Sequence, residues 1–278
     1  MNDKPPTSQA ADPALLALRA EIDALDDAMH DLLMRRAGVV ARMAASRVKA
    51  GAGSPFRPGR EAAVLRRLLA RHSGALSRGA VVRIWRHIIM AHTAIQGAFT
   101  AAVAASGEAA QTLALAREHF GTATPLTPFA SPAQALAALS AGKASVAVLP
   151  APAGEGEGAW WQSLEAPRLS VVARLPFVVD VAHADAALVV APVPPDASGE
   201  DRSVLRLEAS AEASRESFVR MLSDAGLAGR ILCLARQGGR SLALAEIDGF
   251  IAAGDARLAG LNAVLLGAYA VPVTGDLP

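Results

Sequence analysis

The stretch LLALRAEIDALDDAMHDL, residues 15–32, decides the fold of the first part of the chain. Its apolar residues recur at alternating spacings of three and four, which is the period of one face of an α-helix. The pattern continues to about Val48, and Asp12 followed by Pro13 is typical of a helix start. A helix of roughly 35 residues is long for a small domain. We therefore expect its heptad-like seam to pack against a partner helix, which another subunit could supply.

Two more helices are predicted after breakers rich in glycine and proline. The first covers about Gly59–Arg71. The second begins near Ser77, a good N-cap, and continues past Phe99. Residues 13–105 are thus predicted to form a three-helix all-α domain. Residues 1–12 are polar, contain two prolines and are expected to be disordered.

From residue 106 onward the pattern changes to α/β. Helical stretches alternate with short, valine-rich apolar runs of strand length, which predicts a partial α/β lobe over residues 106–192. Residues 193–201 are predicted to be a linker. Residues 202–278 follow the order strand, helix, strand, strand, helix, strand, which is the ferredoxin-like βαββαβ arrangement. The predicted fold class is α plus α/β.

The composition excludes several classes of protein. The net charge of the 278-residue chain is +1, which argues against nucleic acid or an anionic membrane as a partner. The single cysteine, Cys233, excludes a disulfide framework and a four-cysteine zinc site. We find neither an apolar signal core in the first residues nor an apolar run of about eighteen residues, so we expect a cytoplasmic protein.

The placement of arginine is the main chemical signal. Residues 35–87 are rich in arginine, and Glu61, directly after Arg60, is the only carboxylate among them. Arg36 and Arg47 lie eleven residues apart on the first predicted helix, close to three full turns, so both positions face the same way. A guanidinium binds a carboxylate bidentately and stays charged when buried, so several that converge on one cavity would bind a compact dicarboxylate. Alternatively, each arginine is a solvated surface residue.

Four segments together resemble the bacterial chorismate mutases of the all-α class, including the mutase domain that is fused to prephenate dehydratase. They follow the family's order and spacing over about residues 13–100, and they are Leu15–Asp26, Leu32–Arg36, Arg57–Glu61 and Ile88–Gln96. Each segment alone is weakly specific, but all four in register are much more specific. The resemblance implies an intertwined homodimer that converts chorismate to prephenate in aromatic amino-acid biosynthesis.

The resemblance also implies roles for single residues. Arg19 is similar to the arginine that reaches into the partner's active site, and Arg36 to the one that binds a substrate carboxylate. Arg60 and Glu61 match the family's arginine–glutamate pair, in which the glutamate holds the ring hydroxyl. Gln96 matches the side chain that hydrogen-bonds the ether oxygen.

Three positions depart from the family's pattern. Arg47 stands where the family usually has a lysine that touches both a carboxylate and the ether oxygen. Arg57 replaces an acidic residue found in some members, and His92 replaces a serine on the third helix, where it would line the substrate site. These departures bear on catalytic efficiency more than on the type of reaction.

The implied reaction is a one-substrate rearrangement without proton transfer or a covalent intermediate. It needs no nucleophile, metal or cofactor, and we expect none, because the sequence carries no nucleophile, phosphate-loop or metal-ligand motif. It needs a cavity that holds the flexible dianion in its compact conformer, and donors aimed at the ether oxygen. The arginines would supply the first requirement, and Gln96 and Arg47 the second.

The rest of the chain resembles a degenerate prephenate dehydratase followed by an ACT-like regulatory domain. Ala187–Ala191 resembles the strand that carries the dehydratase's Thr-Arg-Phe motif, yet no threonine occurs between Pro128 and Val273. We therefore expect dehydratase activity to be lost. The segments that match the ligand loops of the ACT domain differ from the family's pattern, so amino-acid sensing and a structural or dimerising role both stay open.

Two alternatives to a working mutase follow from these departures. One is a non-catalytic chorismate-binding protein or regulatory partner of another mutase, which Arg47 and His92 favour. The other is a bifunctional chorismate mutase/prephenate dehydratase, against which the missing threonine argues.

Overall fold

The computed structural model describes residues 12–49, 55–105, 110–152, 159–179 and 186–274. The segment predicted to be disordered lies outside these ranges except for its last residue. The chain divides into two units, one with the first helix and one with everything from residue 55 onward. In these ranges, no helix is both long enough and apolar enough to cross a membrane.

The helices and strands follow in chain order, with η2 and η3 denoting 3-10 helices. They are α1 (Pro13–Lys49), α2 (Pro58–Arg71), α3 (Arg78–Gln96), β1 (Ala101–Ala104), α4 (Ala110–Phe120), β2 (Leu126–Phe129), α5 (Pro132–Ser140), β3 (Val146–Pro150), η2 (Ala159–Ser163), β4 (Ser170–Leu175), β5 (Val178–Val179), β6 (Ala187–Ala191), β7 (Asp201–Ser210), α6 (Arg215–Asp224), β8 (Gly229–Gln237), β9 (Arg240–Asp248), η3 (Ala256–Leu258), β10 (Ala263–Ala270) and β11 (Val273–Thr274).

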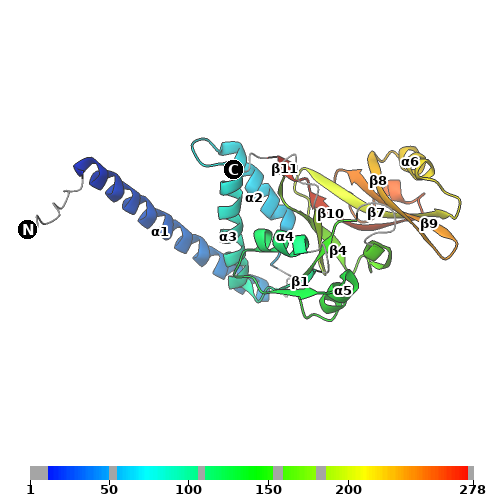
Figure 1. The fold of residues 1–278 in the computed structure, drawn as a ribbon, viewed down its shortest axis with the longest axis horizontal. Coiled ribbons are helices and arrows are strands. Elements are labelled where there is room, and N and C mark those ends of the chain that lie inside the picture. The colour runs from blue at the N-terminus through cyan, green and yellow to red at the C-terminus, as the bar shows by residue number, and fades with distance from the viewer. Residues whose placement is uncertain (1–11, 50–54, 106–109, 153–158, 180–185, 275–278) are drawn as a thin grey trace, which may run out of the picture. The chain divides into compact units, whose positions relative to one another are not determined.

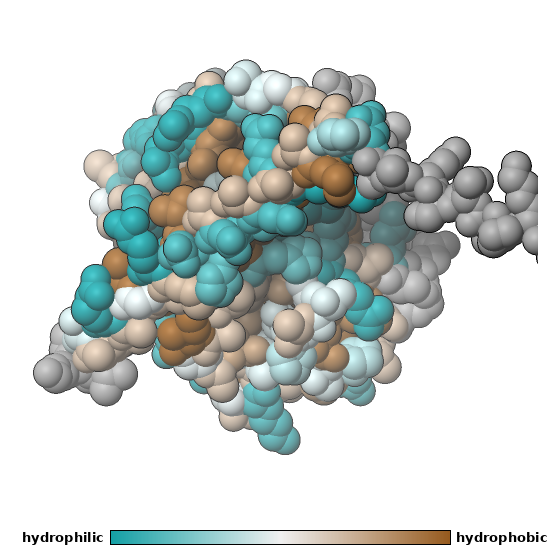
Figure 2. Space-filling view, turned by 90° about the vertical axis from the view of Figure 1, so that its left-hand side faces the viewer, coloured by the Kyte–Doolittle hydropathy of each residue, from teal (hydrophilic) through white to brown (hydrophobic). Residues whose placement is uncertain are grey.

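The first unit is one uninterrupted helix, α1, as its apolar period predicts (Figure 1). The predicted cap is confirmed, because the backbone N–H of Ala14 donates to Asp12 Oδ1 at 3.0 Å. The seam is open, and the side chains of Leu18 and Leu25 are both 58% exposed. Figure 2 shows hydrophobic residues, in brown, at the surface among hydrophilic ones, in teal.

The end of α3 corrects one prediction. The helix was expected to continue past Phe99 but ends at Gln96, and residues 101–104 form β1. All four residues of β1 are buried, and the strand pairs in parallel with β2 on one side and β3 on the other. A central strand covered on both faces is a continuous apolar run without alternation, which is why this segment resembled the end of a helix.

Nine strands form one continuous sheet in the order β2-β1-β3-β6-β4-β10-β7-β9-β8. β10 joins its two halves, since it is parallel to β4 and antiparallel to β7. At this junction Gly267 lies opposite Val171, and a Cβ on the glycine would come within 2.1 Å of the Val171 carbonyl oxygen. The backbones approach this closely only because the residue is glycine.

The last four strands of the sheet confirm the ferredoxin-like prediction. Their spatial order is β10-β7-β9-β8, all neighbours are antiparallel, and α6 connects β7 to β8 (Figure 1). The second helix of the arrangement, predicted over Ala256–Leu261, is only the short η3. Because β10 also pairs with β4, this part is continuous with the preceding α/β part and not a separate sheet.

Helices cover both faces of the sheet. α4 packs on one face through Ala116 and Phe120, whereas α5 and the tryptophans of η2 pack on the other. α2 and α3 form a further core with Phe177 and Val178 of the sheet unit. This packing joins α2 and α3 to the sheet within the second unit.

Candidate functional site

The start of α2 is capped from a distant part of the chain. One carboxylate oxygen of Asp196 accepts the backbone N–H of Gly59 at 3.1 Å, and the other accepts the N–H of Arg60 at 3.1 Å. The same carboxylate also accepts Arg57 Nε at 3.2 Å. A carboxylate in this position satisfies free N–H groups and interacts favourably with the helix dipole. The segment 193–201, expected to be a linker, is therefore a capping segment for α2.

Two further contacts hold α2 in place. A Cβ on Gly59 would lie 2.1 Å from a backbone oxygen of the capping segment, so this close approach requires glycine. Further along α2, Arg66 donates to Ser198 Oγ at 2.8 Å and to the carbonyl oxygens of Glu200 and Val271 at 2.8 and 2.6 Å. The first turn of α2, where Arg60 and Glu61 lie, is thus fixed by the C-terminal part of the chain.

Glu61 does not face solvent. It is 6% exposed and forms an ion pair with Arg86 of α3, with 2.9 Å between Arg86 Nη1 and Glu61 Oε2. The guanidinium of Arg86 lies over the ring of Phe177, 5.1 Å from its centroid. Burial raises the pKa of Glu61 to about 7, although the charge of Arg86 pulls it down, and Asp196 contributes to the rise.

His119 of α4 is buried in the same region as the Glu61–Arg86 ion pair. Arg86 and His119 line two cavities of about 20 and 10 Å³, each with room for about one water molecule. Arg86 Nε and His119 Nε2 are buried without a hydrogen-bond partner among the described residues. Burial, assisted by the charge of Arg86, holds the pKa of His119 well below its usual value, so the imidazole is neutral.

His92 and Gln96 lie one turn apart on α3. Gln96 Nε2 donates to the His92 carbonyl at 3.3 Å, and His92 Nδ1 contacts the Ile88 carbonyl at 2.5 Å. A carbonyl only accepts, so Nδ1 carries a proton in this contact, and the other ring nitrogen is Nε2. That atom is buried and has no partner among the described residues. Along the helix axis Gln96 is about 15 Å from Arg86, the partner of Glu61.

The remaining predicted site residues lie on α1. The side chains of Arg19 and Arg36 are exposed. Arg47 lies on the last turns of the helix, and its side chain is outside the described residues. The structure therefore brings together Arg60 with Glu61 and His92 with Gln96.

Sequence reasoning missed two residues of this region, Arg86 and Asp196. A signal for Arg86 existed, because it stands four residues after Val82 and four before Met90, in the apolar stripe of α3. A charge in such a stripe needs a buried partner. No comparable local signal marks Asp196, whose partners are more than 130 residues away in sequence.

Comparison with known proteins finds similarity to a family in the helical part of the chain. Residues 18–97 match the family model of chorismate mutase type II. The bifunctional chorismate mutase/prephenate dehydratase of Pseudomonas aeruginosa is 33% identical over 140 residues, which cover 49% of this chain and 38% of that protein. The protein of the same name from Stutzerimonas stutzeri is 31% identical over 141 residues, with the same coverage. The matched region spans well under half the length of these relatives.

Solved structures show more distant likeness. The prephenate dehydratase from Streptococcus mutans has 16% identity and a TM-score of 0.45, covering 63% of this chain and 99% of that one. The prephenate dehydratase in complex with L-Phe from Arthrobacter aurescens has 15% identity and a TM-score of 0.46, covering 62% and 90%. The match of residues 18–97, which run from within α1 to just after α3, to the chorismate mutase type II family is the more specific of these similarities.

Proposed function

We propose that the protein is a chorismate mutase that rearranges chorismate to prephenate in aromatic amino-acid biosynthesis. The observation that carries the proposal is the match of residues 18–97 to the chorismate mutase type II family. The names of the two curated relatives support the same substrate. Within the matched range, Arg19, Arg36, Arg60, Glu61 and Gln96 keep the residue types expected of the site.

The mechanism follows from the chemistry of the rearrangement. Arg19, Arg36 and Arg60 would clamp the two carboxylates of chorismate and select its compact conformer. Arg47 and Gln96 would donate to the ether oxygen as negative charge develops there, and a preorganised donor of this kind typically contributes about 2.7–4 kcal/mol. The Gln96 amide bonds to its own helix, so in this mechanism its donor turns from the His92 carbonyl to the substrate.

In this proposal Glu61 binds the ring hydroxyl of chorismate. Arg86 occupies Glu61 Oε2, and Oε1 is left to accept the ring hydroxyl of chorismate. Arg86 would then act as a positioning residue that fixes the carboxylate. The fixed first turn of α2 supports this role, because a clamp is effective only when its geometry is preset.

The proposal includes a homodimer with a cytoplasmic location. The apolar seam of α1 is exposed within one chain, and a second copy of α1 is the partner that the heptad spacing favours. A dimer would also allow Arg19 of one subunit to reach the site of the other. We propose neither a metal nor a cofactor.

One observation favours a non-catalytic alternative. Glu61 is buried in an ion pair and the Gln96 amide is bonded within α3, which suits a protein that binds chorismate or regulates another mutase without turnover. The bifunctional alternative draws support only from the relatives' names. Against it, β6 begins with the buried side chains Ala187 and Leu188, which carry no chemistry.

The deciding experiment supplies chorismate to the purified protein and follows prephenate and phenylpyruvate separately. We expect prephenate well above the uncatalysed rate and no phenylpyruvate. Arg36→Ala and Gln96→Ala should each reduce turnover at least about tenfold, the loss expected of a clamp or a transition-state donor. Arg35→Ala, which removes the neighbouring exposed arginine, is the matched control for register and should change little. No prephenate above background would favour the regulatory alternative, and phenylpyruvate formation would favour the bifunctional one.

A further inference from the structure

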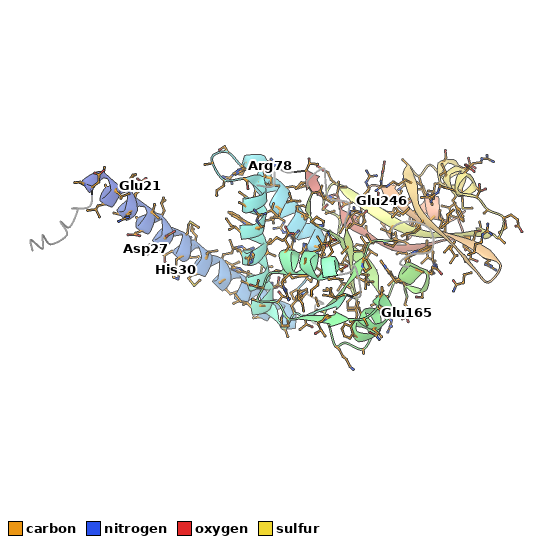
Figure 3. The ribbon with its side chains drawn as sticks, viewed as in Figure 1. Glu21, Asp27, His30, Arg78, Glu165 and Glu246 are labelled. Atoms are coloured by element: carbon orange, nitrogen blue, oxygen red, sulfur yellow. The ribbon has the colours of Figure 1, made fainter. Side chains whose placement is uncertain are left out.

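An open groove of about 460 Å³ lies on the sheet unit, where the ends of five neighbouring strands meet. Its polar lining comes from β4, β10, β7, β8 and β9 and consists of Arg174, Tyr269, Arg202, Arg230, Glu246 and Asp248. Figure 3 labels Glu246 in this part of the sheet. A volume of this size is within the range of small-molecule sites. None of the residues assigned to the mutase site lines it.

The floor of the groove is a hydrogen-bonded network around two buried side chains. Glu246 and Tyr269 are each 4% exposed, and the Tyr269 hydroxyl donates to Glu246 Oε1. Glu246 Oε2 accepts Arg230 Nε and Nη2, both at 2.8 Å. Arg174 donates in turn to the Tyr269 hydroxyl. Burying a carboxylate is costly unless it is paired, and the bonds to Arg230 and Tyr269 offset this cost for Glu246.

The charges in the groove do not cancel. Three guanidinium groups lie beside two carboxylates, and two of the arginines are already paired, Arg230 with Glu246 and Arg202 with Asp248. Arg174 has no carboxylate partner among the described residues. A guanidinium has five N–H donors, and its contact with one hydroxyl leaves most of them for a ligand. The groove therefore has one cationic group to offer to an anion.

The remaining wall of the groove is apolar. Val179, Val271 and Pro272 line it on the side of the small β5–β11 pair. A ligand that satisfies both walls needs an anionic head and an apolar body. We propose that this groove binds a small monocarboxylate with an apolar side group, whose carboxylate pairs with Arg174 and whose apolar part contacts these three residues.

Calorimetric titration of the full-length chain tests the proposal. The probes are phenylacetate, its neutral analogue phenylacetamide, and inorganic phosphate, an anion without an apolar part. We expect saturable binding of phenylacetate, with phenylacetamide and phosphate at least about tenfold weaker, the loss typical of a charge-assisted contact. Arg174→Gln should weaken phenylacetate binding by a similar factor, and Arg174→Lys, which keeps the charge without the planar fork, by less.

Arg257→Gln is the matched control, since Arg257 is ion-paired with Asp255 on the surface at η3, outside the groove. It should bind phenylacetate as the wild type does. Thermal unfolding of each variant checks that the fold is kept. Equal binding of phenylacetate and phenylacetamide, undiminished binding in Arg174→Gln, or no binding at millimolar phenylacetate would each overturn the proposal. These outcomes are independent of mutase activity, because the groove contains none of the proposed mutase residues.

Discussion

Glu61 and Arg86 show how a single buried pair links stability to function. The pair joins α2 to α3 at 2.9 Å, and both side chains are almost completely buried. Burial lowers the pKa of Arg86 and raises that of Glu61, so desolvation opposes the charged form on both sides. Such a pair adds little net stability compared with apolar residues, but the loss of one partner is costly. The arrangement therefore favours a role in positioning over a role in stability.

A pH titration of stability tests this residue. The pKa of Glu61 is about 7 in the folded protein against 4.5 in the unfolded chain, so the folded state binds a proton between these values that the unfolded state lacks. The contribution of Glu61 to stability is therefore fully present below about pH 4.5 and is lost as the pH rises through 7. Glu61→Gln should remove this dependence, which amounts to about 3 kcal/mol for a shift of this size.

The difference between wild type and variant is the quantity to measure, by urea unfolding from pH 4.5 to 8. The pKa of His119 is depressed in the folded protein, so its contribution to stability is lost as the pH falls, opposite to that of Glu61. Wild type and variant share this contribution, so it cancels in their difference. Glu118→Gln is the control, because it neutralises an exposed carboxylate that lines the cavity beside Arg86 and His119. Its stability should follow that of the wild type across this pH range. A constant difference between Glu61→Gln and wild type across this range would contradict the assignment.

At the scale of elements, the capping of α2 by Asp196 predicts a clear mutational effect. Asp196→Ala leaves the N–H groups of Gly59 and Arg60 without their acceptor, and the loss of an N-cap typically costs about 0.5–2 kcal/mol. Asp196→Asn should cost less, because asparagine caps as well as aspartate. Denaturant unfolding measures both, with the exposed Asp224→Ala as control. If Asp196→Ala is as stable as this control, the cap does not hold in solution.

The elements predicted best are those whose pattern is local. The three- and four-residue period of α1 and the turn and strand signals of β7 to β10 lie within each element, so the sequence predicts them well. β1 and β2 are four residues long, and β1 contains three alanines, a residue with no preference for strands. Their parallel pairing depends on partners that are distant in sequence, and no local period reveals it.

For the candidate site, too, local patterns could be predicted from the sequence and long-range contacts could not. Spacing alone predicts that Arg60 lies beside Glu61 and that His92 and Gln96 share a helix face, because each pair lies within one helical turn. The contacts that fix Arg60 and Glu61 come from Arg86, 25 residues from Glu61, and from Asp196, 136 residues from Arg60. Long-range contacts of this kind become visible only when the chain has folded.

At the scale of the whole molecule, the exposed apolar seam of α1 favours association with a partner. Leu18, Ile22, Leu25, Met29 and Leu32 are each between 56 and 60% exposed and lie along one stripe of the helix. Monomeric proteins rarely leave so long an apolar stripe in water. Full burial of one such side chain contributes about 1.5–3 kcal/mol, so five of them per chain would stabilise an association substantially.

We therefore expect a dimer with about twice the chain mass of 28.5 kDa in sedimentation equilibrium. Leu25→Glu places a charge in the seam and should shift the protein to a monomer with reduced mutase turnover. Ala20→Glu adds the same charge about half a turn away from Leu18, on the opposite face of α1, and should stay dimeric. A monomeric wild type, or a dimer that survives Leu25→Glu, would exclude the seam as the interface. Because Arg19 lies on the same helix, a seam that pairs two copies of α1 would also carry this arginine toward the partner's half of the site, so a fall in turnover on dilution should accompany dissociation.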